Sequence, residues 1–216
     1  MCILPFLYLE LPGHSLVLCV QAVCVYLKPP RCGFTIQTGS LVFFASIFSA
    51  SPLARCAMLS LLPSTTLTAP AADAVSSLPG YGPPPTPQYS GFLNASAAEP
   101  GTMLHYWFAA TSAKADWTSA PTIVWFNGGP GSSSVLGMLQ EQGPLVIDKD
   151  GKLMENPYAW TNVANLFVVE SPAGVGYSYC AAMKTGGGCA NSDVSTAKAA
   201  HAALQDFFTT KFPELR

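Results

Sequence analysis

The chain has 216 residues, half of them apolar and one tenth charged, with a formal net charge of −2. It is long enough for one full domain with a sizeable core. Its few charges form no basic patch that would bind nucleic acid and no polybasic stretch that would hold it at a membrane surface.

Residues 1–72 form an apolar leader, which holds five of the seven cysteines. Its apolar runs are shorter than the roughly 18 to 20 residues of a membrane-spanning helix, so we expect no stable membrane span. Two runs followed by small residues, Leu41–Ala50 and Met58–Leu62, are typical of a secretory signal. Because such a signal belongs at the N-terminus, we expect residues 1–39 not to be natural coding sequence. A disordered or anchored apolar extension is the alternative.

Residues 73–87 are rich in Ala, Ser, Gly and Pro, which predicts an extended linker. We expect the folded domain to occupy residues 88–216. Its apolar runs predict strands at Leu104–Ala109, Thr122–Phe126 and Asn165–Glu170. A buried strand carries apolar residues on both faces, as the last two runs do.

Helical patterns alternate with these strands. We expect a short helix over Ser132–Gln142, with its serines capping the free N–H groups. A longer helix begins after a cap at Ser192 or Asp193 and ends at Pro213. Its buried face is predicted to contain apolar residues at helical spacing together with one histidine: Val194, Ala197, His201, Leu204, Phe207 and Phe208. The alternation predicts an α/β fold with a mainly parallel sheet.

The sequence Asn127-Gly-Gly-Pro-Gly-Ser-Ser-Ser lies where a buried strand ends and a helix begins. Ligands of α/β proteins bind at this edge of the sheet, and adjacent glycines allow backbone N–H groups to face a developing negative charge. No lysine follows as in a phosphate-binding loop, and the glycine spacing is not that of a dinucleotide site, so no cofactor is expected. A purely structural glycine turn is the alternative.

Seven segments from Tyr89 onward resemble, in order, the beginning of a serine carboxypeptidase of the yeast, plant and lysosomal kind. They are Tyr89–Leu93, Tyr106–Phe108, Val124–Ser133, Glu141–Pro144, Asn156–Trp160, Glu170–Tyr179 and Phe207–Leu215. The resemblance implies an α/β-hydrolase fold and release of C-terminal residues from peptides and proteins through an acyl-enzyme. It also implies the secretory pathway, ending in a lysosome, a vacuole or the extracellular space.

The same resemblance implies roles for four residues. The backbone N–H of Gly129 would contribute to the oxyanion hole, and Asn127, Gly128 and Glu141 would hold the free carboxylate of the substrate. An acyltransferase on the same scaffold and a non-catalytic binding protein are the alternatives. In such acyltransferases the residue matching Asn127 is commonly replaced, so its presence favours the peptidase.

An α/β-hydrolase needs a Gly-x-Ser-x-Gly nucleophile followed by an acid and a histidine, and the chain contains no such pentad. His14, His105 and His201 follow no candidate nucleophile in the required order. The resemblance implies that the fold is truncated before its central, nucleophile-bearing strand. We expect an inactive fragment whose sheet ends in an unpaired edge.

Two further features concern a secreted protein. Cys180 and Cys189 bracket a glycine-rich segment and are expected to form a disulfide; with no histidine nearby, no metal site is expected. Asn94-Ala-Ser is a glycosylation acceptor.

Overall fold

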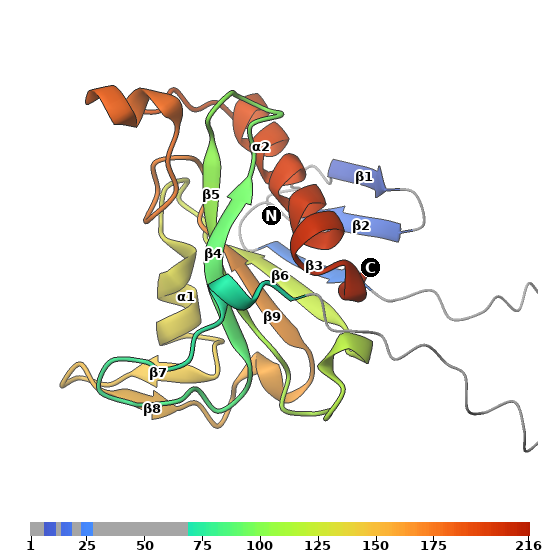
Figure 1. Cartoon of the computed structure of the whole chain (residues 1–216), viewed down its shortest axis with the longest axis vertical. Coiled ribbons are helices and arrows are strands. Elements are labelled where there is room, and N and C mark those ends of the chain that lie inside the picture. The colour runs from blue at the N-terminus through green and yellow to red at the C-terminus, as the bar shows by residue number, and fades with distance from the viewer. Residues whose placement is uncertain (1–6, 12–13, 19–22, 28–68) are drawn as a thin grey trace, which may run out of the picture. The chain divides into compact units, whose positions relative to one another are not determined.

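The computed structural model describes residues 69–216, and it describes residues 7–11, 14–18 and 23–27 as backbone (Figure 1). The signal-like runs Leu41–Ala50 and Met58–Leu62 lie outside these residues. No helix among the described residues is long and apolar enough to cross a membrane. In the leader, β1 (Leu7–Leu11) pairs antiparallel with β2 (His14–Leu18) as a separate two-stranded sheet.

A five-stranded sheet organises the described part of the chain, in the order β3-β6-β9-β5-β4. Its strands are β3 (Val23–Leu27), β4 (Gln88–Asn94), β5 (Met103–Ala109), β6 (Thr122–Phe126) and β9 (Asn165–Val169). The three strands expected from apolar runs are confirmed as β5, β6 and β9.

The expectation of a mainly parallel sheet is wrong for these strands, because β6 and β9 form its one parallel pair. Short connections join antiparallel strands such as β4 and β5, whereas parallel strands need a crossover. The crossover between β6 and β9 contains α1 (Ser134–Gln140) and the hairpin of β7 (Leu145–Ile147) and β8 (Leu153–Glu155). β3 pairs with β6 in antiparallel register, so β6 is not an edge strand of this sheet.

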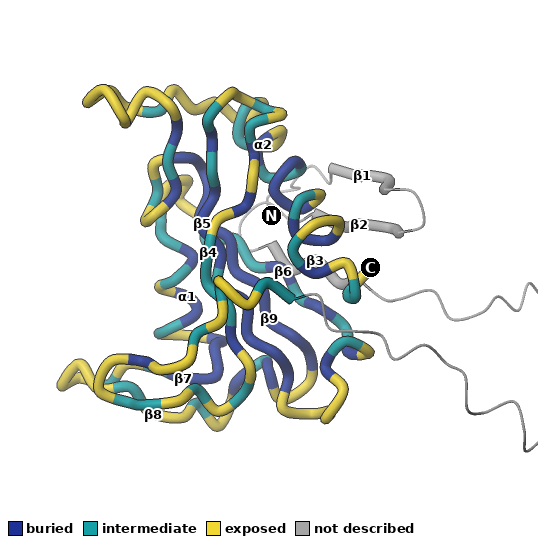
Figure 2. Tube along the Cα trace, in the orientation of Figure 1, coloured by how far each residue is buried: buried dark blue, intermediate teal, exposed yellow. Residues whose placement is uncertain are grey.

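β9 is buried along its whole length and faces two separate cores (Figure 2). Phe167 and Val169 contribute to the larger core, which α2 (Asp193–Asp206) covers. Leu166 and Val168 contribute to the smaller core, together with Met138 of α1. Because successive residues of a strand point to opposite faces, the two helices lie on opposite sides of the sheet, as Figure 1 shows.

A cluster of aromatic rings forms the centre of the larger core. A π-helical turn, Phe207–Lys211, continues α2, and the N–H of Phe212 donates to the carbonyl of Phe207 at 2.7 Å. The ring of Phe207 stacks on Phe167 with centroids 3.8 Å apart. Sequence periodicity did not indicate the fully buried Phe212, since a π turn changes the helical spacing.

The expected start of the long helix is confirmed, with Ser192 as the capping residue. Its side chain accepts from the N–H of Ser195, whose own hydroxyl accepts from the N–H of Ser192. The predictions that Val194 and Ala197 are buried are wrong, because 65% of Val194 is exposed and Ala197 is exposed as well. Val194 is in the first helical turn, ahead of the buried stretch of α2 that begins at Ala199. Residues 69–216 also contain 3₁₀ turns at Ala71–Asp73, Trp117–Ser119, Trp160–Asn162, Ala181–Thr185 and Pro213–Leu215.

The Pro- and Gly-rich segment before β4 is attached to the sheet. Ala74 forms a β-bridge with Tyr89. The carboxylate of Asp73 accepts from the hydroxyl of Tyr106 at 2.8 Å and from Nζ of Lys211 at 2.7 Å. Burial, together with the hydrogen bond to Asp73, raises the pKa of Tyr106. Asp73 thus joins the segment to β5 and to the end of α2.

We predict that Asp73→Ala lowers the free energy of unfolding by about 1 to 3 kcal/mol, because it leaves the partly buried partners of the carboxylate unpaired. The measurement is urea denaturation of the purified chain. Asp150→Ala is the control, since its ion pair with Lys149 is exposed and its loss should cost no more than about 0.5 kcal/mol. Equal effects of the two substitutions would contradict the anchoring role.

Candidate functional site: an exposed glycine loop after β6

Residues 128–131 form an exposed loop at the end of β6. Gly129 has φ 127°, and a Cβ there would lie 3.0 Å from the N of Gly131. Any other residue would therefore be strained and crowded. Among residues 69–216, the N–H groups of Gly129 and Gly131 have no hydrogen-bond acceptor. The loop thus presents backbone donors at the surface, as binding of a negative charge requires.

Asn127 is oriented so that its amide acts as a donor. Its Oδ1 accepts from Nε1 of Trp125, while its Nδ2 makes one long bond of 3.4 Å, to the hydroxyl of Ser132. The Nδ2 group carries two hydrogens, so donor capacity remains unused. Asn127 Nδ2 and the glycine N–H groups are therefore all available as hydrogen-bond donors.

The first turn of α1 is fixed by serine hydroxyls, but not as helix caps. Ser133 is the capping residue, yet its side chain makes no capping bond. Ser134 Oγ instead donates to the carbonyl of Val169 at 2.6 Å and accepts from the N–H of Asn127 at 3.0 Å. The expectation of serine caps is wrong at this helix, because these hydroxyls make tertiary bonds to the end of β9.

Glu141 lies at the C-terminal end of α1 with its carboxylate exposed. Its N–H donates to the carbonyl of Gly137 at 3.0 Å, and its carbonyl accepts from Nδ2 of Asn156 at 2.9 Å. A Cβ on Gly137 would lie 2.8 Å from Oδ1 of Asn127, so this helical turn packs directly against the Asn127 amide. The structure thus places Asn127 directly before the loop and Gly128 and Gly129 on it. Glu141 lies one helical turn after Gly137, the residue that contacts the Asn127 amide.

Glu170, directly after β9, belongs to a polar cluster that sequence reasoning missed. Its Oε2 lies 3.2 Å from Nδ1 of His105, and Nε2 of that histidine lies 2.9 Å from the hydroxyl of Ser90. The available signal was the pairing of two adjacent strands, which sets Phe92 opposite His105 and so brings Ser90 near its ring. Neither residue spacing nor a motif indicated the contact with Glu170.

Ser90, His105 and Glu170 have the connectivity of a nucleophile, base and acid. Two features distinguish them from a working triad. The 3.2 Å contact at Nδ1 is not aligned as a hydrogen bond, and Ser90 lies within β4 rather than on a turn beside free N–H groups. The exposed N–H groups lie instead on the loop after β6.

Comparison with known proteins identifies the family. The family model of serine carboxypeptidases matches residues 79–216. The chain belongs to the serine carboxypeptidase family.

Relatives of the chain include mouse lysosomal protective protein, 41% identical over 168 residues, which are 77% of this chain and 33% of that protein. Serine carboxypeptidase-like 40 of Arabidopsis thaliana is 43% identical over 109 residues, 50% of this chain and 21% of that protein. A prohormone-processing carboxypeptidase of Saccharomyces cerevisiae matches in structure with a TM-score of 0.51 and 26% identity, over 60% of this chain and 29% of that one. The chain therefore spans a third or less of the length of these relatives.

Asn94, the first residue of the glycosylation acceptor, ends β4 in an exposed position. Its backbone N–H donates to Asp206, and its Oδ1 accepts from the N–H of Ser96 at 2.9 Å. Among residues 69–216 its Nδ2, the atom that would carry a glycan, has no hydrogen-bond partner.

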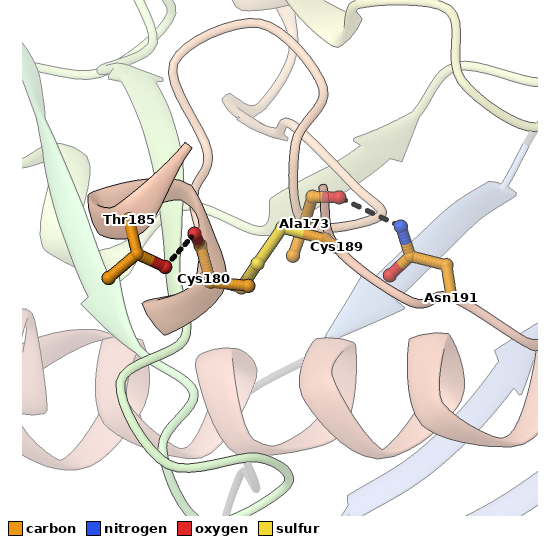
Figure 3. Close-up of a disulfide and its surroundings, with 6 residues drawn as sticks. Ala173, Cys180, Thr185, Cys189 and Asn191 are labelled. Atoms are coloured by element: carbon orange, nitrogen blue, oxygen red, sulfur yellow. Dashed lines mark hydrogen bonds between the residues drawn. A yellow bond between two sulfur atoms is a disulfide. The ribbon is translucent and has the colours of Figure 1, made fainter. Parts of the chain in front are cut away.

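Cys180 and Cys189, which were expected to pair, are joined by a disulfide (Figure 3). Beside it, Nδ2 of Asn191 donates to the carbonyl of Ala173 at 2.8 Å. The bridge and this bond together hold the segment before α2 against the loop that follows Glu170.

We predict that replacing both Cys180 and Cys189 with Ser lowers the free energy of unfolding by about 2 to 3 kcal/mol, the loop-closure value for a bridge across nine residues. Urea denaturation of the oxidised protein measures it. Mass spectrometry of secreted material should show the bridge intact, and two free thiols there would contradict the assignment.

Proposed function

We propose that these residues form part of a serine-type carboxypeptidase that releases C-terminal residues from peptides and proteins through an acyl-enzyme. The observation that supports this proposal best is the exposed loop on which Asn127 Nδ2 and the N–H groups of Gly129 and Gly131 are donors with capacity to spare. A free chain end and a tetrahedral intermediate both present negative oxygen atoms, and both need such donors.

The four residues would divide the work between recognition and catalysis. Asn127, the backbone of Gly128 and the Glu141 carboxyl group would bind the terminal carboxylate of the substrate, with Glu141 donating in its protonated form. The N–H of Gly129 would stabilise the oxyanion. The nucleophile that this mechanism needs would be a serine on a Gly-x-Ser-x-Gly turn, a pentad that residues 1–216 do not contain, together with its acid and base.

We also propose that the protein passes through the secretory pathway to a lysosome, a vacuole or the extracellular space. The mouse relative is named a lysosomal protein, and the exposed Asn94 would be glycosylated on the way. The apolar runs between Leu41 and Ala71 would supply the export signal.

We predict that residues 1–216 alone hydrolyse no peptide, because an oxyanion donor without a nucleophile cannot form an acyl-enzyme. The chain would be incubated at mildly acidic pH with a blocked dipeptide and with a fluorophosphonate probe. Neither turnover nor labelling is expected. Labelling of Ser90, the hydroxyl next to His105, would contradict the prediction and identify a second nucleophile.

In the full-length protein, Asn127→Ala and Glu141→Ala should each reduce kcat/KM about 10- to 150-fold for substrates with a free C-terminus. This range corresponds to the roughly 1.5 to 3 kcal/mol of a hydrogen bond to a charged group. C-terminally amidated substrates lack the second carboxylate oxygen and should be affected much less. Gly129→Ala should slow both substrate types together, because a side chain crowds the oxyanion site.

Glu99→Ala, at an exposed position outside the site, is the control for Glu141→Ala and should leave both rates unchanged. Equal losses on free-acid and amidated substrates for Asn127→Ala and Glu141→Ala would refute the carboxylate assignment.

A further inference from the structure

The carboxylate of Glu170 is buried, with 1% of the residue exposed. Its Oε1 accepts from the hydroxyl of Ser133, the residue that joins the loop to α1. Its Oε2 accepts from the N–H of Tyr177 at 2.7 Å and lies 3.2 Å from Nδ1 of His105. One carboxylate thus contacts β5, the start of α1 and the loop after β9.

The carboxylate lies directly against the backbone of Gly176. A Cβ on Gly176, which has φ 53°, would lie 2.0 Å from one carboxylate oxygen and 2.1 Å from the other. The hydroxyl of Ser178 donates to the carbonyl of Glu170 at 2.6 Å and accepts from the N–H of His105 at 2.8 Å. Both the side chain and the main chain of Glu170 are therefore fixed.

We propose that Glu170 is a positioning residue, which holds the loop carrying Asn127 and Gly129 in its ligand-binding shape by fixing Ser133 at the end of that loop. Glu170 touches no substrate itself and acts through the loop. The inference rests on the proposed function of the loop. Ser134 fixes the same helical turn through the carbonyl of Val169, so the loop has two adjacent anchors on the end of β9.

The charge of Glu170 matters for this role. Burial alone would raise the pKa of the carboxyl, but the adjacent His105 ring and hydrogen bonds from Ser133 and the N–H of Tyr177 lower it below its ordinary value. The titratable group facing Glu170 is His105 of β5, whose ring also contacts Tyr177 and Ser90. A group with a lowered pKa stabilises the fold above its unfolded pKa and loses this contribution as the pH falls through its folded pKa. The anchor therefore persists in mild acid and is released in stronger acid.

The test compares three variants of the full-length protein: Glu170→Gln, Ser133→Ala and, as a matched control for the loss of a glutamate, Glu99→Gln. Hydrogen–deuterium exchange of the Ser132 amide, whose N–H donates to the carbonyl of Gly128 across the loop at 3.2 Å, reports on the loop directly, without any substrate. Glu170→Gln and Ser133→Ala should each speed this exchange about 10-fold or more, because each removes a hydrogen bond to a charged group. Glu99→Gln should leave it unchanged.

Kinetics supply a second readout. Glu170→Gln should lower kcat by about 10-fold with a smaller change in KM, because a displaced oxyanion donor affects the transition state most. The advantage of the wild type over Glu170→Gln should disappear in strong acid, where Glu170 itself is protonated.

Unchanged exchange of the Ser132 amide in both Glu170→Gln and Ser133→Ala would overturn the proposal, even if both proteins melt at lower temperature. If Glu170→Gln does not fold, Ser133→Ala, which removes only a hydroxyl, decides the matter by the same exchange measurement. A wild-type protein that hydrolyses no peptide would refute the proposed function, and the exchange result would still show whether Glu170 holds the loop.

Discussion

At the C-terminal end of β9, two buried polar groups must find hydrogen-bond partners: the carbonyl of Val169 and the carboxylate of Glu170. Because the strand is buried on both faces, a carbonyl or carboxylate at its C-terminal end has little access to water and costs free energy unless it is paired. The carbonyl of Val169 is paired by Ser134, and the carboxylate of Glu170 by Ser133 and Tyr177. Since two of these partners begin α1, the needs of the buried strand fix where that helix starts and so determine the path of the glycine loop before it.

This constraint explains which features the sequence could predict. Apolar runs alone indicate strands, and β6 and β9 are found where they were expected. β9 is buried on both faces, whereas β6 buries Thr122 and Val124 on one face and leaves Ile123 and Trp125 half-buried on the other. The glycine loop was predictable for a similar local reason, because the Asn127-Gly-Gly-Pro-Gly sequence follows the end of such a run. The start of α2 at Ser192 is also local, since both halves of its capping interaction lie within four residues.

Features that depend on residues far apart in the chain were not predictable in the same way. A serine at a helix start usually caps the helix. Ser133 and Ser134 instead bind groups that lie 37 and 35 residues away in the chain, which no local sequence pattern indicates. The direction of strand pairing is likewise a property of the whole sheet, which explains why the parallel expectation failed. The attachment of Asp73 to Lys211 spans 138 residues, so composition indicated only the extended character of its segment.

The orientation of the Asn127 amide determines which of its atoms, the oxygen or the nitrogen, is left for a ligand. An asparagine side chain can donate or accept, and in isolation it would bind anions and cations without strong preference. Here Trp125 Nε1 occupies the acceptor oxygen of Asn127, and that indole is positioned by its edge contact with Trp160 in the smaller core. The group left for a ligand is Nδ2, a donor, beside glycine N–H groups of the same polarity. Packing of two tryptophans on one face of the sheet thus orients the Asn127 amide as the proposed binding of negatively charged oxygen atoms requires.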